Sequence, residues 1–397
     1  MIPTLDRPTL AAGADPLAVA RSLAPELSDR AREAEMLGTM PPDLVAHIRA
    51  TGLLRALQPR ALGGFELEPA RFLEVIEELA RADGSAGWTT TIGAGGSAFA
   101  AWLEPAVAED LFGRDADFTS ATVFAPTGRA TPAGDDGFTV EGRWPFASGC
   151  RHAEWFVTGV FVMDGDAPRL IPDRGPDWRL VYFPSDEGEI VDNWDVMGLR
   201  ATGSNDIAAR ALHVAEVHTV SPFFEPARQN GPLWRLSFFT LAGVALVGVP
   251  LGIARRALDE VTELAVTKVR GGSFQTVAED PAAQVELARA EAGLGAARAF
   301  VFDELGSLWS TACAGDAPSV AQRARFQLAT NHAMRAAVEA VDVAMALSGA
   351  GAIRSSEPLQ RCFRDVHTVN QHAYFSTAAL KRYANDRFGI AQPTFML

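Results

Sequence analysis

RWPFASGCRHAEW, residues 143–155, lies in the middle of the chain, in a stretch of short apolar segments separated by turns. DNWDVMGLRATGSND, residues 192–206, belongs to the same stretch. RCFRDVHTVNQHAY, residues 361–374, comes near the end of the chain, in a segment with helical periodicity. The separation of the three segments predicts one site that is assembled from two domains.

The composition is that of an ordinary globular protein with a sizeable core. The chain has 397 residues, 48% of them hydrophobic, which is enough for two or three domains. Its formal net charge is -14, and no basic run interrupts the sequence. Because phosphate binding relies on clustered lysine and arginine, this charge argues against nucleic acids and anionic membranes as partners.

The cysteines and the apolar runs indicate the environment of the protein. The chain has three cysteines, which lie far apart without CxxC or Cys/His spacing, so we expect neither a disulfide framework nor a metal site, and a reducing cytoplasm. The first sixteen residues do not have the pattern of a signal peptide. The longest apolar run, residues 240–254, is too short and too interrupted for a membrane span and predicts a buried core helix.

Periodicity divides the chain into three parts and predicts a mainly helical α+β fold. In residues 1–116, apolar side chains recur at intervals of three and four residues, as in Phe72, Val75, Ile76 and Leu79. This spacing predicts a helical domain. Residues 117–225 hold short strand candidates that follow one another without helices, which favours an antiparallel barrel or sandwich.

Residues 226–397 form the third part. Four long helical stretches can be drawn in it, roughly 234–268, 281–313, 318–349 and 357–388. Long helices joined by short links are what an antiparallel four-helix bundle requires.

This order of domains and six motifs along the chain resemble the acyl-CoA dehydrogenase fold. More specifically, they resemble the branch of that superfamily made of flavin-dependent monooxygenases, the oxygenase components of two-component systems. The motifs are DGSAGW (83–88), TVFAPTGRA (122–130), GRWPFASGCRHAEW (142–155), WDVMGLRATGSND (194–206), KVRGGSF (268–274) and RDVHTVNQH (364–372). The resemblance implies a homotetramer that binds FMN or FAD in a cleft between the β domain and the bundle.

The resemblance also implies which residues hold the flavin. Ser148 stands where this superfamily hydrogen-bonds flavin N5, Trp155 where an aromatic covers the ring, and Arg270, assisted by Gln284, where an arginine contacts the flavin phosphates across a subunit interface. The full predicted cofactor-binding set is Trp88, Phe124, Ser148, Gly149, Trp155, Thr202, Ser204, Arg270 and Gln284. The alternative is an ordinary β-turn with a core tryptophan and a solvated arginine.

The C-terminal motif distinguishes two kinds of chemistry. In dehydrogenases of this fold a glutamate shortly after the Arg-Asp pair takes the substrate α-proton, and no glutamate follows Arg364 and Asp365 here. His367 and His372 take its place, about 140° apart around a helix. An imidazole near flavin can donate a hydrogen bond or accept a proton. We predict His372 as the first catalytic candidate, with Ser148 and then His367, against the alternative of surface histidines.

Other motifs narrow the activity further. In phenol-hydroxylating members of this branch a histidine follows the GSAGW segment, but the corresponding stretch here, TTTIGAGGSAFAAW, has none. GAGG at 93–96 lacks the full GxGxxG spacing and is interpreted as a packing segment that lines the pocket. No hydrolase, zinc-protease or Walker motif is present.

These observations predict a reduced-flavin-dependent monooxygenase. A separate NAD(P)H:flavin reductase would supply FMNH2 or FADH2, a flavin C4a-hydroperoxide would form with O2, and one oxygen atom would pass to a small organic substrate by aromatic hydroxylation or N-oxidation. Two alternatives stay open at this point. One is an acyl-CoA dehydrogenase with tightly held FAD and an atypical base, and the other is a helical scaffold without cofactor.

Overall fold

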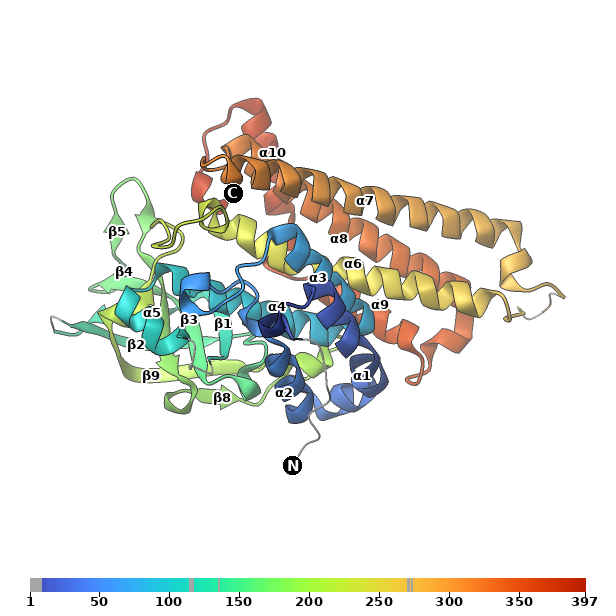
Figure 1. The fold of residues 1–397 in the computed structure, drawn as a ribbon, viewed down its shortest axis with the longest axis horizontal. Helices are drawn as coiled ribbons and strands as arrows, with labels where there is room; N and C mark the ends of the chain where they lie inside the picture. Colours follow the sequence, from blue (N-terminus) through green and yellow to red (C-terminus); the bar gives the residue numbers. More distant parts are fainter. Residues whose placement is uncertain (1–8, 114–117, 135, 270–271, 273) are drawn as a thin grey trace.

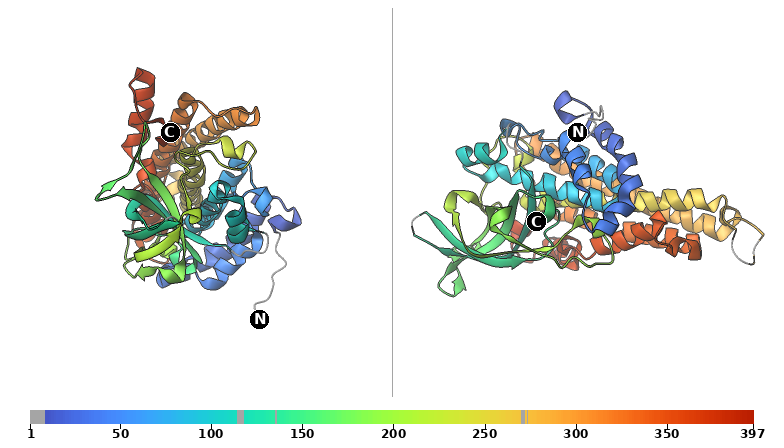
Figure 2. Two further views of the ribbon diagram at one scale, coloured as in Figure 1. Left: turned by 90° about the vertical axis from the view of Figure 1, so that its left-hand side faces the viewer. Right: turned by 90° about the horizontal axis from the view of Figure 1, so that it is seen from below.

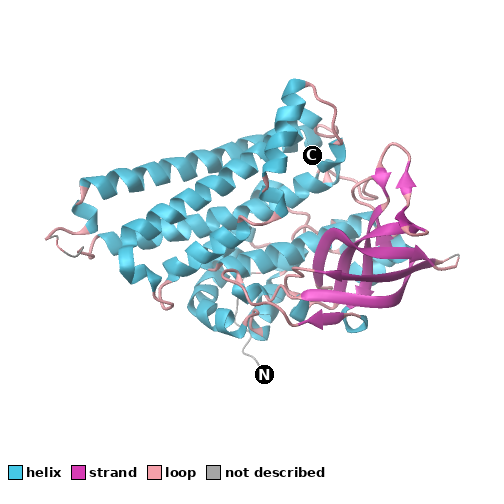
Figure 3. Cartoon of the chain, turned by 180° about the vertical axis from the view of Figure 1, so that it is seen from behind, coloured by secondary structure: helices cyan, strands magenta, loops and turns pink. Residues whose placement is uncertain are grey.

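The computed structural model describes residues 9–113, 118–134, 136–269, 272 and 274–397. Figure 1 shows the strands gathered at one end of the molecule and the long helices extending to the opposite end. The N-terminal helices lie against both parts. The same division is seen from behind in Figure 3, where the sheet forms one end and helices the rest.

Five helices make up the N-terminal part: α1 (Pro16–Leu37), α2 (Pro42–Thr51), α3 (Pro69–Ala82), α4 (Gly84–Ala98) and α5 (Pro105–Phe112). Four of them have proline in the first turn, where the missing N–H has no intrahelical partner to lose. The apolar face predicted for residues 72–79 is the buried face of α3, which packs on the long helix α6. The helical texture predicted for this part is therefore present.

The middle part is one large sheet with the strand order β10-β7-β3-β1-β2-β9-β8. Its strands are β1 (Ser120–Pro132), β2 (Gly137–Trp144), β3 (Trp155–Asp164), β7 (Trp178–Pro184), β8 (Glu189–Val191), β9 (Asp206–Ala215) and β10 (Thr219–Val220), with β4 (Ala167–Pro168) beside β3. A small hairpin of β5 (Leu170–Ile171) and β6 (Gly175–Pro176) stands apart. The left panel of Figure 2 looks at the molecule from this end.

One pair in the sheet differs from the antiparallel expectation. Among the described strands, β1 and β3 are paired parallel, with Ser120 opposite Trp155, while the other pairs are antiparallel. β2 folds back on one edge of β1 and pairs with β9 on its own other edge, and β3 joins the remaining edge of β1 in the same direction as β1. Residues 145–154 therefore cross the end of β1, and they contain the Ser148 turn.

The C-terminal part is a helical bundle of α6 (Phe238–Ala265), α7 (Pro281–Cys313), α8 (Val320–Ser348), α9 (Pro358–Val369) and α10 (Thr377–Phe388). The prediction of one helix over 357–388 was wrong, because α9 ends at Val369 and α10 starts at Thr377. At the break the imidazole of His372 accepts the backbone N–H of Tyr374 at 3.2 Å, a local bond that competes with the helical one. His372 consequently lies in a turn and not on a helix.

Helix α6 is the centre of the core. By length and hydropathy both α6 and the segment Val320–Ile353 pass a test for a membrane span, but 83% of the most apolar window of α6 is buried inside the protein. Packing thus accounts for its apolar character, as predicted for residues 240–254. A Cβ added to Gly252 would come within 2.2 Å of the Glu77 carbonyl, so this glycine allows α6 and α3 to touch.

Candidate active site

A continuous chain of buried hydrogen bonds links the N-terminal helices to two loops of the β domain. Trp88 Nε1 on α4 donates to Ser148 Oγ at 2.9 Å. Ser148 Oγ lies 2.7 Å from Ser204 Oγ, and Ser204 Oγ lies 2.6 Å from Thr202 Oγ1. Thr202 Oγ1 donates to the carbonyl of Leu199 at 2.8 Å. The sequence predicted these four polar residues as one site, and the structure brings them together.

Backbone hydrogen bonds join the two loops of the β domain, residues 145–154 and residues 192–205. The N–H of Gly149 donates to the Thr202 carbonyl at 2.9 Å, and the N–H of Ala147 donates to the Asn205 carbonyl at 3.0 Å. Gly149 has a φ of 76°, in the left-handed region that favours glycine. Loop 145–154 and loop 192–205 therefore form one rigid unit beside α4.

An orphan hydroxyl lies next to this unit. Thr89 Oγ1 is buried and has no hydrogen-bond partner among the described residues. A Cβ added to Gly149 would meet the Thr89 methyl group at 3.5 Å, so the two residues are neighbours. A buried hydroxyl without a partner is costly unless a ligand satisfies it. Thr89 Oγ1 is one of several such atoms in the described part of the chain, and its place beside the Ser148 turn makes it a candidate partner for the polar edge of a ligand.

His372 reaches the same place from the C-terminal part. Its ring packs edge-on against Trp88, with 5.4 Å between ring centroids. Because Nδ1 accepts the N–H of Tyr374, the neutral ring carries its proton on Nε2. Desolvation by burial lowers the pKa of His372 to about 4. The imidazole is therefore a neutral hydrogen-bond donor at pH 7 and not a charged acid.

The structure places His367 elsewhere. Its Nε2 lies 2.9 Å from Asp342 Oδ1 on α8, and its ring lies 4.5 Å from that of Phe363. These contacts are on the side of α9 that faces α8. The prediction of His367 as a second catalytic candidate therefore gains no geometric support from this chain.

Two of the predicted aromatic residues also lie outside the hydroxyl chain. The ring of Trp155 stacks on Phe118 at 6.4 Å and meets His218 edge-on at 6.0 Å. Phe124 lies on β1 and contacts Phe238, with 5.3 Å between centroids. Trp155 thus belongs to an aromatic cluster near α5, whereas Phe124 belongs to the pocket described below.

Of the predicted phosphate-binding pair, the structure describes Gln284 alone. Arg270 lies outside the described residues. Gln284 is exposed in the first turn of α7, where its Nε2 donates to the Ala278 carbonyl at 2.8 Å. Figure 1 shows that this end of α7 is at the opposite end of the bundle from the strands.

Two buried carboxylates support the site and were not assigned a role from the sequence. Asp365 Oδ1 accepts the N–H of Leu199 at 2.6 Å, and Asp83 Oδ1 caps α4 by accepting the N–H of Ala86 at 2.9 Å. Gly84 allows their approach, because a Cβ there would lie 2.9 Å from Asp365 Oδ2. Burial and the charge of Asp83 raise the pKa of Asp365 to about 7, and burial raises the pKa of Asp83. The N-cap position of Asp83 before Gly-Ser-Ala was a usable sequence signal.

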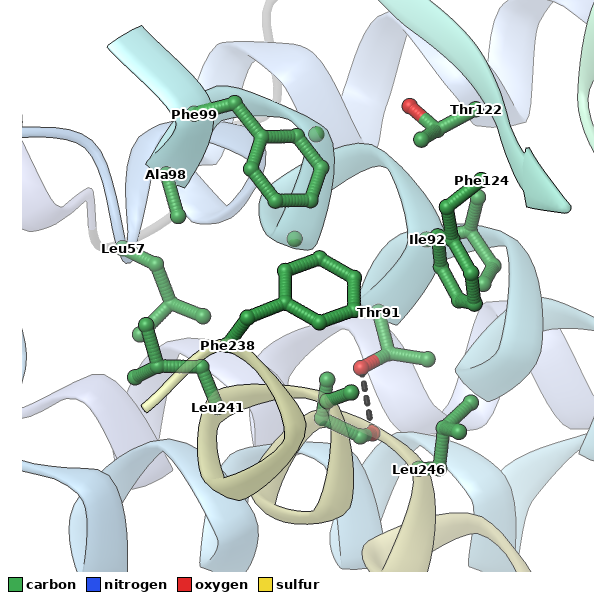
Figure 4. A pocket seen from close by; sticks show the side chains of 14 residues that line it. Leu57, Thr91, Ile92, Ala98, Phe99, Thr122, Phe124, Phe238, Leu241 and Leu246 are labelled. Atoms are coloured by element: carbon green, nitrogen blue, oxygen red, sulfur yellow. Dashed lines mark hydrogen bonds between the residues drawn. The ribbon is translucent and has the colours of Figure 1, made fainter. Parts of the chain in front are cut away.

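An apolar pocket lies along α4 beyond Trp88, and Figure 4 shows the side chains that line it. Thr91, Ile92 and Gly95 follow Trp88 by three, four and seven residues, so they share its face of the helix. Among the described residues the lining consists of Leu57, Thr91, Ile92, Gly95, Gly96, Ala98, Phe99, Thr122, Phe124, Phe238, Leu241, Ala242, Ala245 and Leu246.

Aromatic rings form the walls of this pocket. Phe99 and Phe238 are stacked at 5.6 Å, and Phe124 meets Phe238 edge-on. The Thr91 hydroxyl donates to the Ala245 carbonyl on α6, and the Thr122 hydroxyl is hydrogen-bonded to Ser120 Oγ at 3.3 Å. No lining residue has an ionisable side chain. The GAGG segment predicted to line a pocket contributes Gly95 and Gly96.

The described residues contain no group of three or more histidine, cysteine, aspartate or glutamate side chains arranged to hold a metal ion.

Comparison with known proteins agrees with this geometry. Residues 17–120 match the model of the acyl-CoA dehydrogenase N-terminal domain, and residues 244–377 match that of an acyl-CoA dehydrogenase C-terminal domain. The indole-3-acetate monooxygenase of Pseudomonas putida is 34% identical over 348 residues, which cover 87% of each chain. The oxygenase subunit HsaA of the flavin-dependent monooxygenase of Rhodococcus jostii is 30% identical, covering 93% of this chain and 97% of HsaA.

The crystal structure of 3-HSA hydroxylase from Rhodococcus sp. RHA1 superimposes with a TM-score of 0.89 at 28% identity, covering 97% of this chain and 99% of that one. The match therefore extends over all three parts of the molecule. The chain belongs to the acyl-CoA dehydrogenase superfamily, in its branch of flavin-dependent monooxygenases that act as oxygenase components of two-component systems.

Proposed function

We propose that the chain binds reduced FMN or FAD with the flavin N5 edge at Ser148 and transfers one atom of O2 to a small aromatic substrate in the apolar pocket. When bound, the reduced flavin supplies two electrons, so that one oxygen atom enters the substrate and the other leaves as water. The single observation that carries the proposal is the buried chain from Trp88 through Ser148 to Thr202, next to the orphan hydroxyl of Thr89.

The residues around Ser148 suit the polar edge of a planar ring. Ser148 Oγ and Thr89 Oγ1 offer hydroxyls, and loop 145–154 is fixed by its bonds to loop 192–205. A preorganised set of hydrogen-bonding groups needs no rearrangement when the ligand arrives. His372 adds a neutral Nε2–H donor above Trp88, suited to hydrogen-bond a ligand oxygen without protonating it.

The pocket has a separate role, which is to hold the substrate and exclude water. Its walls are Phe99, Phe124 and Phe238, and none of its lining residues is charged. Exclusion of water favours oxygen transfer over release of H2O2. The nature of the walls supports an uncharged aromatic or heteroaromatic substrate, oxidised on carbon or on nitrogen.

Two partners belong to the proposal. A separate NAD(P)H:flavin reductase is supported by the description of HsaA as an oxygenase subunit and of a further relative as an oxygenase component. A homotetramer is part of the proposal because the resemblance implies that an arginine, assisted by Gln284, contacts the flavin phosphates across a subunit interface. The dehydrogenase alternative lacks support because the polar groups around Ser148 are hydroxyls and an imidazole, with Asp83 and Asp365 engaged by backbone N–H groups.

The test is anaerobic titration of the purified chain with FMNH2 and FADH2, followed by O2 and indole as a neutral aromatic probe. We expect a reduced flavin to bind and most of it to be oxidised with formation of product instead of H2O2. Ser148→Ala should shift the outcome toward H2O2. Failure to bind either reduced flavin, or tight retention of oxidised FAD without oxygen transfer, would overturn the proposal.

A further inference from the structure

The hydrogen bonds around Ser148 have a defined direction. Thr202 uses its single hydroxyl hydrogen to donate to the Leu199 carbonyl, so it can only accept from Ser204. Ser204 has then used its own hydrogen and can only accept from Ser148. Trp88 Nε1 has no acceptor capacity and donates to Ser148. Hydrogen-bond donation therefore has a single direction: Trp88 donates to Ser148, Ser148 to Ser204, Ser204 to Thr202, and Thr202 to the Leu199 carbonyl.

This direction fixes what Ser148 can offer a ligand. Its hydrogen points to Ser204, and one lone pair is used by Trp88. One lone pair of Ser148 Oγ remains free. While this series of hydrogen bonds is intact, Ser148 can therefore accept a hydrogen bond from a ligand but cannot donate one.

The terminal carbonyl is itself immobilised. Leu199 has a φ of 52°, a left-handed conformation that costs energy for a residue with a side chain. Its N–H is bound by Asp365 Oδ1 at 2.6 Å, and Asp365 is buried. Because Trp88 Nε1 can only donate and the Leu199 carbonyl can only accept, the direction of this series of hydrogen bonds is costly to reverse.

Flavin N5 changes its hydrogen-bonding character with redox state. Reduced flavin carries a hydrogen on N5 and donates, whereas oxidised flavin has only a lone pair there and accepts. An acceptor at Ser148 complements the first form and leaves the second without a partner, which is an unfavourable arrangement in a buried site.

We propose that Ser204 and Thr202 determine the redox selectivity of the site, by holding Ser148 as a hydrogen-bond acceptor that favours reduced over oxidised flavin. The inference rests on the proposed placement of flavin N5 at Ser148. Neither residue touches the reacting atoms in this arrangement; both act through Ser148 and are positioning residues.

Binding of the two redox forms provides the test. The dissociation constants of FMN, FMNH2, FAD and FADH2 are measured anaerobically for the full chain, and the oxidised-to-reduced ratio is compared between variants. Ser204→Ala frees the Ser148 hydrogen to donate to oxidised N5, so we expect the ratio to fall by about tenfold, mainly through tighter binding of the oxidised form. Thr202→Val should lower the ratio in the same direction, and Thr202→Ser, which keeps the donor to Leu199, should preserve it.

Two controls separate this effect from general damage. Ser97→Ala removes a buried serine hydroxyl of α4 that donates to the Ala94 carbonyl and lies outside the chain of hydrogen bonds, so it should leave the ratio unchanged. Ser148→Ala removes the acceptor itself and should lower the ratio by weakening the reduced form. If the ratio is unchanged in Ser204→Ala and Thr202→Val while reduced flavin binds normally, the inference is refuted but the proposed function is not. Absence of binding in the unsubstituted chain refutes the proposed function.

Discussion

Asp365 accepts the backbone N–H of Leu199 at 2.6 Å, although the two residues are 166 positions apart in the sequence. The bond joins α9 of the bundle to loop 192–205 of the β domain, and the Leu199 carbonyl then anchors Thr202. The Arg364 side chain strengthens the same junction, because its Nη1 donates to the Met197 carbonyl at 2.6 Å and its other nitrogen pairs with Glu35 on α1. One short segment of α9 thus holds all three parts of the molecule.

The first prediction concerns this bond. Asp365→Ala leaves the buried N–H of Leu199 without an acceptor and should lower the free energy of unfolding by roughly 1–3 kcal/mol. Asp365→Asn keeps an acceptor oxygen and should cost less at pH 7. Urea unfolding of the two variants beside the unsubstituted chain measures the difference, and equal losses for both would contradict the assigned bond.

The second prediction is a pH dependence of stability. The pKa of Asp365 is raised from 3.8 to about 7 by burial and by Asp83, so between these values the folded chain holds a proton that the unfolded chain has released. The stabilisation from this group is complete below pH 3.8 and is lost as the pH rises through about 7. Asp365→Asn removes the titrating group and should flatten this part of the curve of unfolding free energy against pH. A slope as steep as that of the unsubstituted chain would assign the effect to other groups.

The third prediction concerns His372. Because its pKa is lowered from 6.5 to about 4, the ring stays neutral across the neutral pH range, and the ratio of product to H2O2 should show no step near pH 6.5 that depends on it. His372→Ala should raise H2O2 release severalfold, because the Nε2–H donor is lost. His367→Ala serves as the matched histidine control, since His367 pairs with Asp342 and we expect coupling to stay unchanged. Reversal of the two results would move the catalytic role to His367.

The fourth prediction uses two adjacent glycines of α4. A Cβ on Gly96 would lie 2.2 Å from Ser120 Oγ and 2.9 Å from Thr122 Oγ1, whereas a Cβ on Gly95 would meet nothing within 4 Å. Gly96→Ala must displace the Ser120 and Thr122 hydroxyls, which lie 3.3 Å apart, or shift α4, and should destabilise by roughly 1–3 kcal/mol. Gly95→Ala removes a helix-disfavouring glycine and should stabilise by roughly 0.5–1 kcal/mol. Chemical unfolding of both variants checks the contrast.

The fifth prediction concerns the charge of the substrate. Since no lining residue of the pocket is ionisable, a carboxylate there would be desolvated without a counter-ion. Indole should therefore be oxygenated with better coupling and lower KM than indole-3-acetate, the substrate named for the relative in Pseudomonas putida. A preference for indole-3-acetate would show that its carboxylate is bound by a group outside this pocket.

The sequence predicted the domain order from local periodicity. Trp88, Ser148, Thr202 and Ser204 were predicted as flavin-binding residues from the resemblance of their motifs to those of the family, and the structure brings them into contact. The assignment of Asp365 required a contact between residues far apart in the chain, which no periodicity reveals.

Other parts of the site depended on geometry that a pattern cannot supply. The prediction of one helix over 357–388 missed the turn at His372. There a hydrogen bond from a backbone N–H to the imidazole interrupts an otherwise regular helical pattern. Trp155 is on a strand as expected, yet its ring direction follows from packing on Phe118. The roles of Gln284 and Arg270 remain predictions, since Arg270 lies outside the described residues.

The parallel pairing of β1 with β3 has a consequence for protein engineering. Residues 145–154 must reach from one side of β1 to the other, so the distance across the strand sets a minimum length below which β3 could not pair with β1. The β1–β2 hairpin carries no such constraint and is the better place for a deletion or a new chain terminus. Altered chemistry at Ser148 is therefore better sought by substitution than by shortening this loop.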